Sequence, residues 1–529
     1  MSSNASNATN NEVFVYTGEG GAAVPRDVVR VRVNPTVTSI PSHAFANRTI
    51  TEVELCEGLV EIGDGSFGWC GNSITKINIP ISLRWINNCA FWNSLRCPIR
   101  LHDGIESIGE GAFAYCIFTN FRVPPLITEI PQYMIDGCKS MFSLELPKDV
   151  TEIGNEALTS CYCLRNVAFP PNADVGYNIF IEEGMEMTDL QQLFGSEAQI
   201  ITALQLRFNG LPIHSIVYYH SYQEGVLQIL IAAINMRLGL HRTSGNELDL
   251  TGNQQDCLGM TPLHILTCSS IHDLELYRVI VEKYPANLIT EDRWGALPLL
   301  YAFWGAAPTV IIQFLLESYR SLYPDHVFNW TLMVETMGRC DTPTESIENL
   351  LRVRQMHFPE QPLDWVYLLN KFAEPSSRIY EAPFQERMRF LFTRGMSSRV
   401  KALPFEVWRD HIMNVIQTAE FKQRKSGNSD ILHRIQANII HFEDELPKLK
   451  EITTILELAL WKLRMNENGH QDMATHDSNV RRQCRTTCGA DVVIFHVLPY
   501  LTAVVDEESD SYVESDSDST SDDESSDTM

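Results

Sequence analysis

The sequence has few basic residues for its size, and this shortage excludes several classes of partner. Its 41 lysines and arginines stand against 67 aspartates and glutamates, which gives a formal net charge of −26. A body this acidic repels nucleic acid and anionic lipid over most of its surface. We therefore expect no nucleic-acid partner.

Long hydrophobic runs are also missing. The longest apolar stretch, residues 492–505, is too short to span a bilayer and contains His496 and Pro499. The segment before Glu12 is polar and has no apolar core of the kind that a signal peptide needs. We expect an intracellular protein, in the cytoplasm rather than the nucleus, that does not insert into membranes. Its 13 cysteines are then expected to be reduced thiols.

The motifs of common enzyme classes are absent too. The Gly-Glu-Gly-Gly run at residues 18–21 lacks the Lys-Ser/Thr ending of a phosphate-binding loop. The metalloprotease, serine hydrolase and kinase motifs do not occur. The sequence predicts no catalytic, cofactor-binding or metal-binding residues, and no cofactor.

What the sequence does contain is a short phrase that returns about every 22 to 24 residues from Val31 to Phe169. An isoleucine anchors each copy: Ile40, Ile62, Ile86, Ile108, Ile130 and Ile153. A large apolar residue follows five positions later: Phe45, Phe67, Phe91, Phe113, Ile135 and Leu158. A fixed period of this size predicts a stacked solenoid, an architecture that presents surfaces rather than a catalytic pocket.

Each copy also contains an alternating segment with two inward apolar residues. The pairs are Val31/Val33, Val53/Leu55, Ile77/Ile79, Ile99/Leu101, Phe121/Val123, Leu144/Leu146 and Val167/Phe169. Period-two alternation predicts a strand whose middle residue points away from the core. We call these middle residues the charged stripe: Arg32, Glu54, Asn78, Arg100, Arg122 and Glu145, followed by Ala168. One hypothesis is that the stripe contacts a protein partner; the alternative is a solvated sheet face.

Four copies place a cysteine three residues after the large apolar residue, and a fifth places Ser94 there. The cysteines are Cys70, Cys116, Cys138 and Cys161. They lie a full repeat apart, whereas zinc ligands must converge and usually come in closely spaced pairs. We interpret them as small apolar residues that fill the core.

These repeats resemble the BspA-like, bacterial-surface-antigen type of leucine-rich repeat. The resemblance covers about residues 28–175 and is closest at residues 105–116 and 150–161. It implies a β-rich solenoid of a kind found in large families of unicellular eukaryotic proteins, mostly of unknown role.

A second repeat follows with a different period. Pro212, Pro262 and Pro298 each precede an apolar residue, and an Asp-x-x-Gly turn begins at Asp256 and at Asp292. Proline suits the first position of a helix, and a preceding threonine suits the N-cap. Second helices are expected at residues 274–284 and 310–323, each stopped by a proline.

The Thr-Pro-Leu-His run at residues 261–264 resembles the signature of ankyrin repeats, although only this copy carries it in full. The resemblance implies a helical solenoid in which His264 is a structural hydrogen-bonding residue. It also implies partner-facing loop tips near Asp256 and near Asp292, Arg293 and Trp294.

The remainder is expected to be helical and then disordered. One apolar helical stripe, which could support a weak homo-oligomer, consists of Leu449, Ile452, Leu456, Ala459 and Leu463. The last 24 residues combine eleven acidic residues with eight serines, which predicts disorder. Four serines match an acidophilic kinase consensus: Ser511, Ser515, Ser519 and Ser521.

The fold class predicted is therefore an α+β multi-domain repeat protein. The expected parts are a polar N-terminal segment (1–27), leucine-rich repeats (28–175), a linker (176–205), ankyrin-like repeats (206–335), a helical region (336–465), a linker with an apolar segment (466–505) and an acidic tail (506–529). The function expected first is a non-catalytic scaffold that binds protein partners. Two alternatives are an intracellular sensing or regulatory receptor that reads ligands with its repeats, and a chaperone-like factor whose acidic tail binds basic partners.

Overall fold

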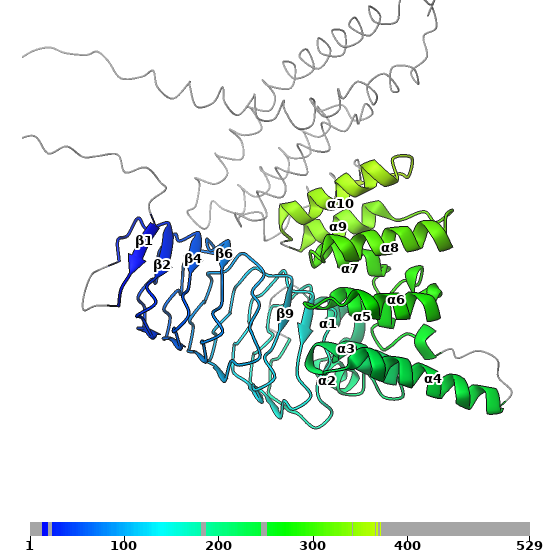
Figure 1. Cartoon of the computed structure of the whole chain (residues 1–529), viewed down its shortest axis with the longest axis horizontal. Helices are drawn as coiled ribbons and strands as arrows, with labels where there is room; N and C mark the ends of the chain where they lie inside the picture. The colour runs from blue at the N-terminus through cyan, green and yellow to red at the C-terminus, as the bar shows by residue number, and fades with distance from the viewer. Residues whose placement is uncertain are drawn as a thin grey trace, which may run out of the picture. The chain divides into compact units, whose positions relative to one another are not determined.

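The computed structural model describes residues 13–18, 24–180, 187–244, 251–340, 342–364, 367–368 and 371. These residues form a solenoid of short parallel strands and, after it, a series of paired helices (Figure 1). The predicted helix at residues 449–463 and the four predicted phosphorylation sites lie outside the described residues.

Short strands on two sides of the solenoid form what we call face A and face B. Face A contains β1 (Val13–Tyr16), β2 (Arg30–Val33), β4 (Glu52–Glu54), β6 (Lys76–Ile77), β9 (Asn120–Arg122) and β11 (Ser143–Glu145). Face B contains β3 (Ser39–Ile40), β5 (Glu61–Ile62), β7 (Trp85–Ile86), β8 (Ser107–Ile108), β10 (Glu129–Ile130), β12 (Glu152–Ile153) and β13 (Asp174–Val175). All the pairings are parallel and in register from coil to coil, as in Ile40 opposite Ile62. The period in the sequence thus predicts the stacking.

The strand predicted at Ile99/Leu101 does not form, although both side chains are buried as expected. Pro98 precedes them and lacks the amide hydrogen that a ladder requires. Face A is therefore interrupted between β6 and β9.

The core of the solenoid contains the predicted apolar position of each coil. Phe45, Phe67, Phe91 and Phe113 are fully buried, and their rings stack with centroids 4.9, 5.4 and 5.7 Å apart. Ile135 and Leu158 continue the same position in the next two coils. The prediction of a continuous core from this position is confirmed.

The cysteines that recur in the repeats fill the core, as predicted. Cys70, Cys116, Cys138 and Cys161 are at most 3% exposed. Each sulfhydryl donates to a backbone carbonyl of the preceding coil, as Cys116 does to Phe91 at 3.0 Å. Ser94 occupies the same position in its coil and donates to the carbonyl of Phe67, which explains why serine can replace cysteine there.

The helices that follow are α1 (Asp189–Phe194), α2 (Glu197–Gln205), α3 (Pro212–Tyr218), α4 (Val226–Ser244), α5 (Pro262–Cys268), α6 (Leu274–Lys283), α7 (Pro298–Trp304), α8 (Thr309–Leu322), α9 (Trp330–Arg339) and α10 (Thr344–His357). Short 3₁₀ turns lie at His220–Tyr222, Thr251–Asn253 and Pro285–Leu288. Helices α3, α5 and α7 each begin at the predicted proline, and α6 and α8 end just before Pro285 and Pro324 as predicted. Helix α5 packs against α3 and α7, so the pairs form a stack.

The predicted domain limits missed structure at both ends of the first solenoid. The polar N-terminal segment contains β1, which pairs with β2 and covers Phe45 with the ring of Tyr16. The segment predicted as a linker, residues 176–205, contains α1 and α2, whose Leu190, Ile200 and Leu204 are buried. Capping boxes begin both helices, at Thr188 and Ser196.

Candidate functional site

The N-terminal half of the charged stripe is exposed, and its charges are arranged between neighbouring strands. Arg32 lies opposite Glu54 and binds it, with 2.6 Å between Nε and Oε2. Both side chains are about half exposed, at 51% and 55%. The hydrogen bond to Glu54 raises the pKa of Arg32. Such a surface offers paired charges and hydrogen-bonding groups to a partner.

The next two members of the stripe differ from this pair. Asn78 is exposed, and its side-chain amide bonds the backbone N–H and carbonyl of Leu55 at 2.9 and 2.6 Å. It therefore helps to hold the neighbouring strand segment. Arg100 is exposed.

The C-terminal half of the stripe is buried, and the expectation that it faces solvent was wrong. Arg122 is only 7% exposed and Glu145 only 2%. The helical region of the same chain covers this part of face A because the ends of its inner helices, α3 and α5, contact the strands β9 and β11. Ala168, the last residue of the row, is buried as well.

Arg122 binds the segment that follows α3. Its guanidinium donates to the hydroxyl and the backbone carbonyl of Ser221 at 3.1 and 2.9 Å. It also forms an ion pair with Asp103 at 2.7 Å and lies 4.3 Å from the ring centre of Tyr222. The guanidinium of Arg122 is therefore occupied by contacts within the same chain.

Glu145 accepts hydrogen bonds from two helix ends at once. One carboxylate oxygen accepts from the backbone N–H of Ser270 at 2.7 Å and from the hydroxyls of Ser269 and Ser270. The other accepts from the hydroxyl of Ser221 at 3.0 Å. This buried carboxylate therefore connects β11 with the ends of α3 and α5.

Two tyrosines add hydrogen bonds to the strand backbone. The hydroxyl of Tyr218 donates to the carbonyl of Leu144 at 2.7 Å. The hydroxyl of Tyr222 reaches the carbonyls of Val123 and Glu145 at 2.8 and 3.0 Å. Burial raises the pKa of both tyrosines well above the ordinary value, so the hydroxyls remain donors. Both hydroxyls thus join the helical region to the backbone of the strands.

The loop tips predicted to face partners are partly buried, which corrects that expectation for Asp256 and Asp292. Asp256 forms a fully buried ion pair with Arg207 at 2.7 Å, and Arg207 also donates to Asn166 in the last coil of the first solenoid. Asp292 accepts a hydrogen bond from the hydroxyl of Tyr301 and from two backbone N–H groups of its own turn. Arg293, at the tip itself, is exposed.

The Asp-x-x-Gly turns explain why these aspartates point inward. Oδ1 of Asp256 accepts from the backbone N–H groups of Leu258 and Met260 at 2.9 and 2.8 Å. Gly259 and Gly295 have φ angles of +76° and +73°, which glycine adopts without strain. The aspartate side chain is therefore part of the turn and is directed toward the solenoid.

His264 acts as the structural residue that was predicted. It is fully buried, and its Nδ1 contacts the hydroxyl of Thr261 at 2.9 Å. Its Nε2 contacts the carbonyl of Ala296 at 3.1 Å, which links one helix pair to the next. Burial lowers the pKa of His264, so the ring is neutral near pH 7.

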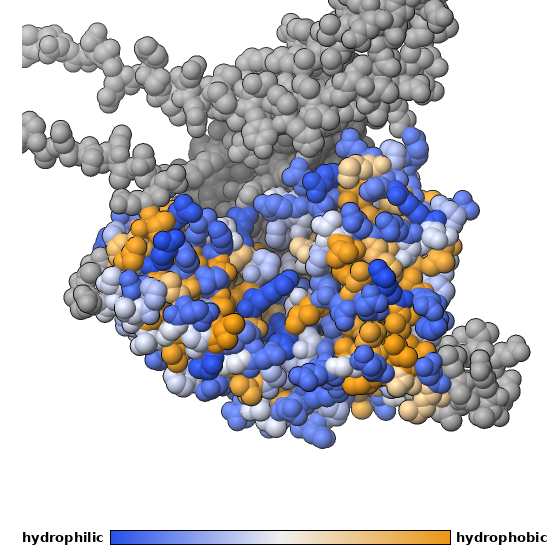
Figure 2. All heavy atoms as spheres, in the orientation of Figure 1, coloured by the Kyte–Doolittle hydropathy of each residue, from blue (hydrophilic) through white to orange (hydrophobic). Residues whose placement is uncertain are grey.

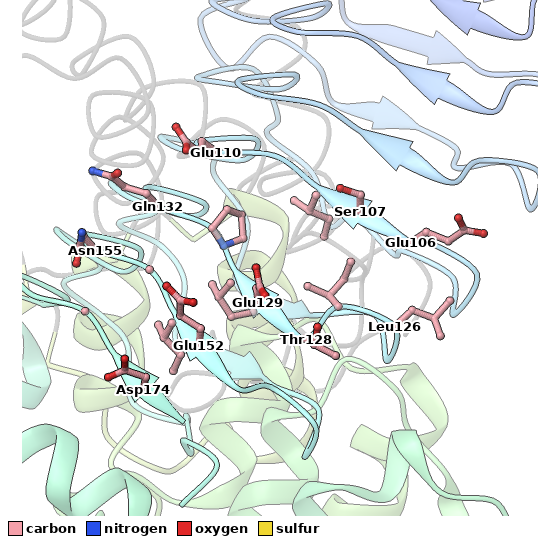
Figure 3. Close-up of a pocket in the computed structure, with 17 residues that line it drawn as sticks. Glu106, Ser107, Glu110, Leu126, Thr128, Glu129, Gln132, Glu152, Asn155 and Asp174 are labelled. Carbon is pink, nitrogen blue, oxygen red and sulfur yellow. The ribbon is translucent and has the colours of Figure 1, made fainter. Parts of the chain in front are cut away.

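Face B contains a shallow groove that sequence reasoning missed. It has a volume of about 710 Å³ and lies over β8, β10, β12 and β13. Figure 3 shows the side chains of Glu129, Glu152 and Asp174 on successive strands. These three residues are exposed and directly opposite one another in the parallel register. Like charges placed opposite one another repel, so this groove attracts cationic groups.

A signal for this groove was present in the sequence. The residue before each anchoring isoleucine is Glu129, Glu152 or another polar residue in most copies, and Trp85 in one. Because the anchor is buried, its neighbour must point outward, so this second outward row could have been predicted by the same alternation as the charged stripe.

Other parts of the surface expose hydrophobic residues. Figure 2 shows them on the visible face over the helices and at the N-terminal end of the solenoid. Ile229, Ile271 and Val310 are 43%, 43% and 50% exposed.

No described helix is long and apolar enough to cross a membrane. No group of three or more metal-ligating side chains converges within the described residues.

Comparison with known families agrees with this geometry. Residues 27–98 and 96–194 match the family model described as the BspA type leucine rich repeat region, in six copies. Residues 27–194 form a BspA-type leucine-rich repeat region. The match extends beyond residue 175, the predicted end of the repeats, and includes α1. The leucine-rich repeats and the helices after them confirm the predicted fold class for the described part of the chain.

Two solved structures are similar to this chain over part of its length. A leucine-rich repeat protein from Bacteroides ovatus is 24% identical, with a TM-score of 0.26 over 33% of this chain and 44% of that one. A leucine-rich repeat protein from T. pallidum is 20% identical, with a TM-score of 0.22 over 26% of this chain and 79% of that one. The chain thus spans less than half the length of the Bacteroides protein. No curated protein matches the chain.

Proposed function

We propose that this protein is a non-catalytic scaffold that binds protein partners through the exposed half of face A. One observation carries the proposal: the covered half of the same face already binds a protein surface, the helices of its own chain. Arg122 and Glu145 make that contact with serine hydroxyls, backbone groups and an aromatic ring. Protein surfaces commonly present these same groups to a partner.

The exposed half repeats this chemistry. Arg32, Glu54 and Arg100 stand in earlier coils at the positions that Arg122 and Glu145 occupy later, and all three are exposed. A partner that docks there would continue the surface that the helices already use. The resemblance of the helices to ankyrin repeats, and an intracellular setting, remain parts of this proposal.

The test compares charge reversal on two surfaces. Arg32→Glu together with Arg100→Glu changes the exposed half of face A. Arg278→Glu together with Lys283→Glu makes the same change of charge on α6, where both residues form exposed ion pairs. Proximity labelling in native cells compares the two double variants with the unchanged chain, after thermal unfolding has shown that all three fold.

The proposal predicts that partners of the unchanged chain disappear with the face A variant and persist with the α6 variant. The same set of partners with all three chains would contradict it. A measured catalytic turnover that resides in the described residues would contradict the non-catalytic part.

A further inference from the structure

One covalent bond joins the leucine-rich repeats to the helical region. Cys163 in the last coil and Cys340 at the end of α9 form a disulfide, with their Cα atoms 6.3 Å apart and a sequence separation of 177. The expectation that all the cysteines are reduced is wrong for this pair. No repeat period relates the two cysteines, because they come from different repeat systems.

The same junction contains a non-covalent link that keeps the two cysteines together. Asp189 of α1 accepts from Arg165 at 2.7 Å, and Arg165 is two residues beyond Cys163. The same carboxylate accepts from Arg339 at 2.9 and 3.1 Å, and Arg339 is adjacent to Cys340. Asp189 therefore holds the neighbours of both cysteines, whether or not the sulfurs are bonded.

Most of the other described cysteines are poorly suited to redox chemistry. Burial raises the pKa of eight of them, and the thiolate is the form that reacts: Cys70, Cys89, Cys97, Cys116, Cys138, Cys161, Cys257 and Cys268. Within the described residues, Cys163 and Cys340 are the cysteines that form a disulfide.

We propose that Cys163 and Cys340 form a reversible redox clamp that controls how firmly α9 and α10 are held to the rest of the structure. A dithiol reductant opens it by exchange: one reductant thiolate attacks a sulfur of the bond to give a mixed disulfide, and the second reductant thiol completes the displacement. The protein gains two electrons and two protons, and the reductant becomes a disulfide. A small-molecule disulfide reverses the reaction.

Burial makes this clamp slow to open. Cys163 is 1% exposed and Cys340 is 0% exposed, so a reductant reaches the sulfurs only after a local opening of the junction. The packing of α10 against α7 and the hydrogen bond from Arg339 to Asp189 do not require the bond between the sulfurs. These contacts hold the thiols near each other, and the bond can therefore form again. What changes is the frequency with which α9 and α10 open.

The test measures amide hydrogen exchange of the full chain with and without a dithiol reductant. Peptide mapping under non-reducing conditions first shows whether the Cys163–Cys340 linked peptide is present after treatment with a small-molecule disulfide. We expect exchange in residues 330–357 to be at least about tenfold faster after reduction, and exchange in residues 62–113 to be unchanged.

Two variants separate the clamp from a general loss of stability. Cys340→Ser should exchange at the reduced rate under both conditions. Cys161→Ser removes a buried free thiol two residues from Cys163 and should keep the full dependence on reductant. Equal exchange of the oxidised and reduced unchanged chain in residues 330–357 would overturn the proposal, and so would absence of the linked peptide after oxidation. Both results come from the unchanged chain and do not depend on the folding of a variant.

Discussion

The two halves of face A are built from the same repeat, but one half is exposed to water and the other is covered by helices. In the N-terminal half, Arg32 pairs with Glu54 on the neighbouring strand, and both remain in contact with water. In the C-terminal half, Arg122 and Glu145 occupy equivalent positions but bind the ends of helices, and they are buried. The repeat therefore determines which way a side chain points, whereas the rest of the chain determines which groups that side chain contacts.

Breaking a buried ion pair of the helical region should cost far more stability than breaking a partly exposed pair on face A. Asp256→Ala leaves the guanidinium of Arg207 buried without its partner, and we expect a loss of about 3–5 kcal/mol in the free energy of unfolding. Denaturant titration measures it. The matched control is Glu52→Ala, which removes the partly exposed partner of Arg30 and should change stability far less because water screens that pair. Equal losses would show that burial does not determine how much such an ion pair contributes.

Glu145 and Glu54 give a second comparison at equivalent positions of the repeat. Glu145→Ala removes the acceptor for the hydroxyls of Ser221, Ser269 and Ser270, and buried donors without partners are costly. We expect a loss of about 3 kcal/mol, measured by thermal unfolding. Glu54→Ala should shift the midpoint little. A larger effect at Glu54 than at Glu145 would reverse the assignment of the two halves.

Sequence alone predicted the elements that depend on local pattern. The period predicted the solenoid, the phenylalanine stack and the buried cysteines, and proline with Thr261 predicted the starts of the inner helices. The burial of Arg122 and Glu145 and the disulfide could not be predicted, because they depend on contacts between segments separated by about 75 to 177 residues. The pattern of a single sequence shows which residues are buried within one repeat, but it does not show which distant segments meet.

Acid should destabilise the protein through a buried histidine of the helical region. Burial lowers the pKa of His214 to about 4, below its ordinary value of 6.5. Between these values the unfolded chain binds the proton and the folded chain does not, so the stability that this group contributes is complete above pH 6.5 and falls as the pH drops toward 4. The loss approaches about 3 kcal/mol for this residue.

Unfolding followed by tyrosine fluorescence at several pH values tests this dependence. His214→Gln retains a donor toward the carbonyl of Gln254 but does not titrate, so its pH slope should be smaller than that of the unchanged chain. An identical slope in the variant would show that His214 is not responsible. Burial also lowers the pKa of His272 to about 4, which leaves a residual slope.

The smallest expected effect compares the two faces of the solenoid. On face A, Lys76 lies opposite Glu52, whereas on face B, Glu152 lies between Glu129 and Asp174. Glu152→Gln removes two like-charge repulsions and should stabilise the protein by about 0.5 kcal/mol at low salt. The gain should shrink at high ionic strength because salt screens exposed charges. A loss of stability at low salt would show that the carboxylate has a favourable partner.

Carboxylate footprinting of the native full-length chain with a water-soluble carbodiimide, read by peptide mass mapping, measures directly which half of face A is covered. Glu54 and Glu145 occupy equivalent positions of the repeat, and only the helices distinguish them. The division of face A predicts that Glu54 is modified rapidly and that Glu145 is modified only when the protein unfolds. Equal modification of the two residues under native conditions would show that the helices do not cover face A.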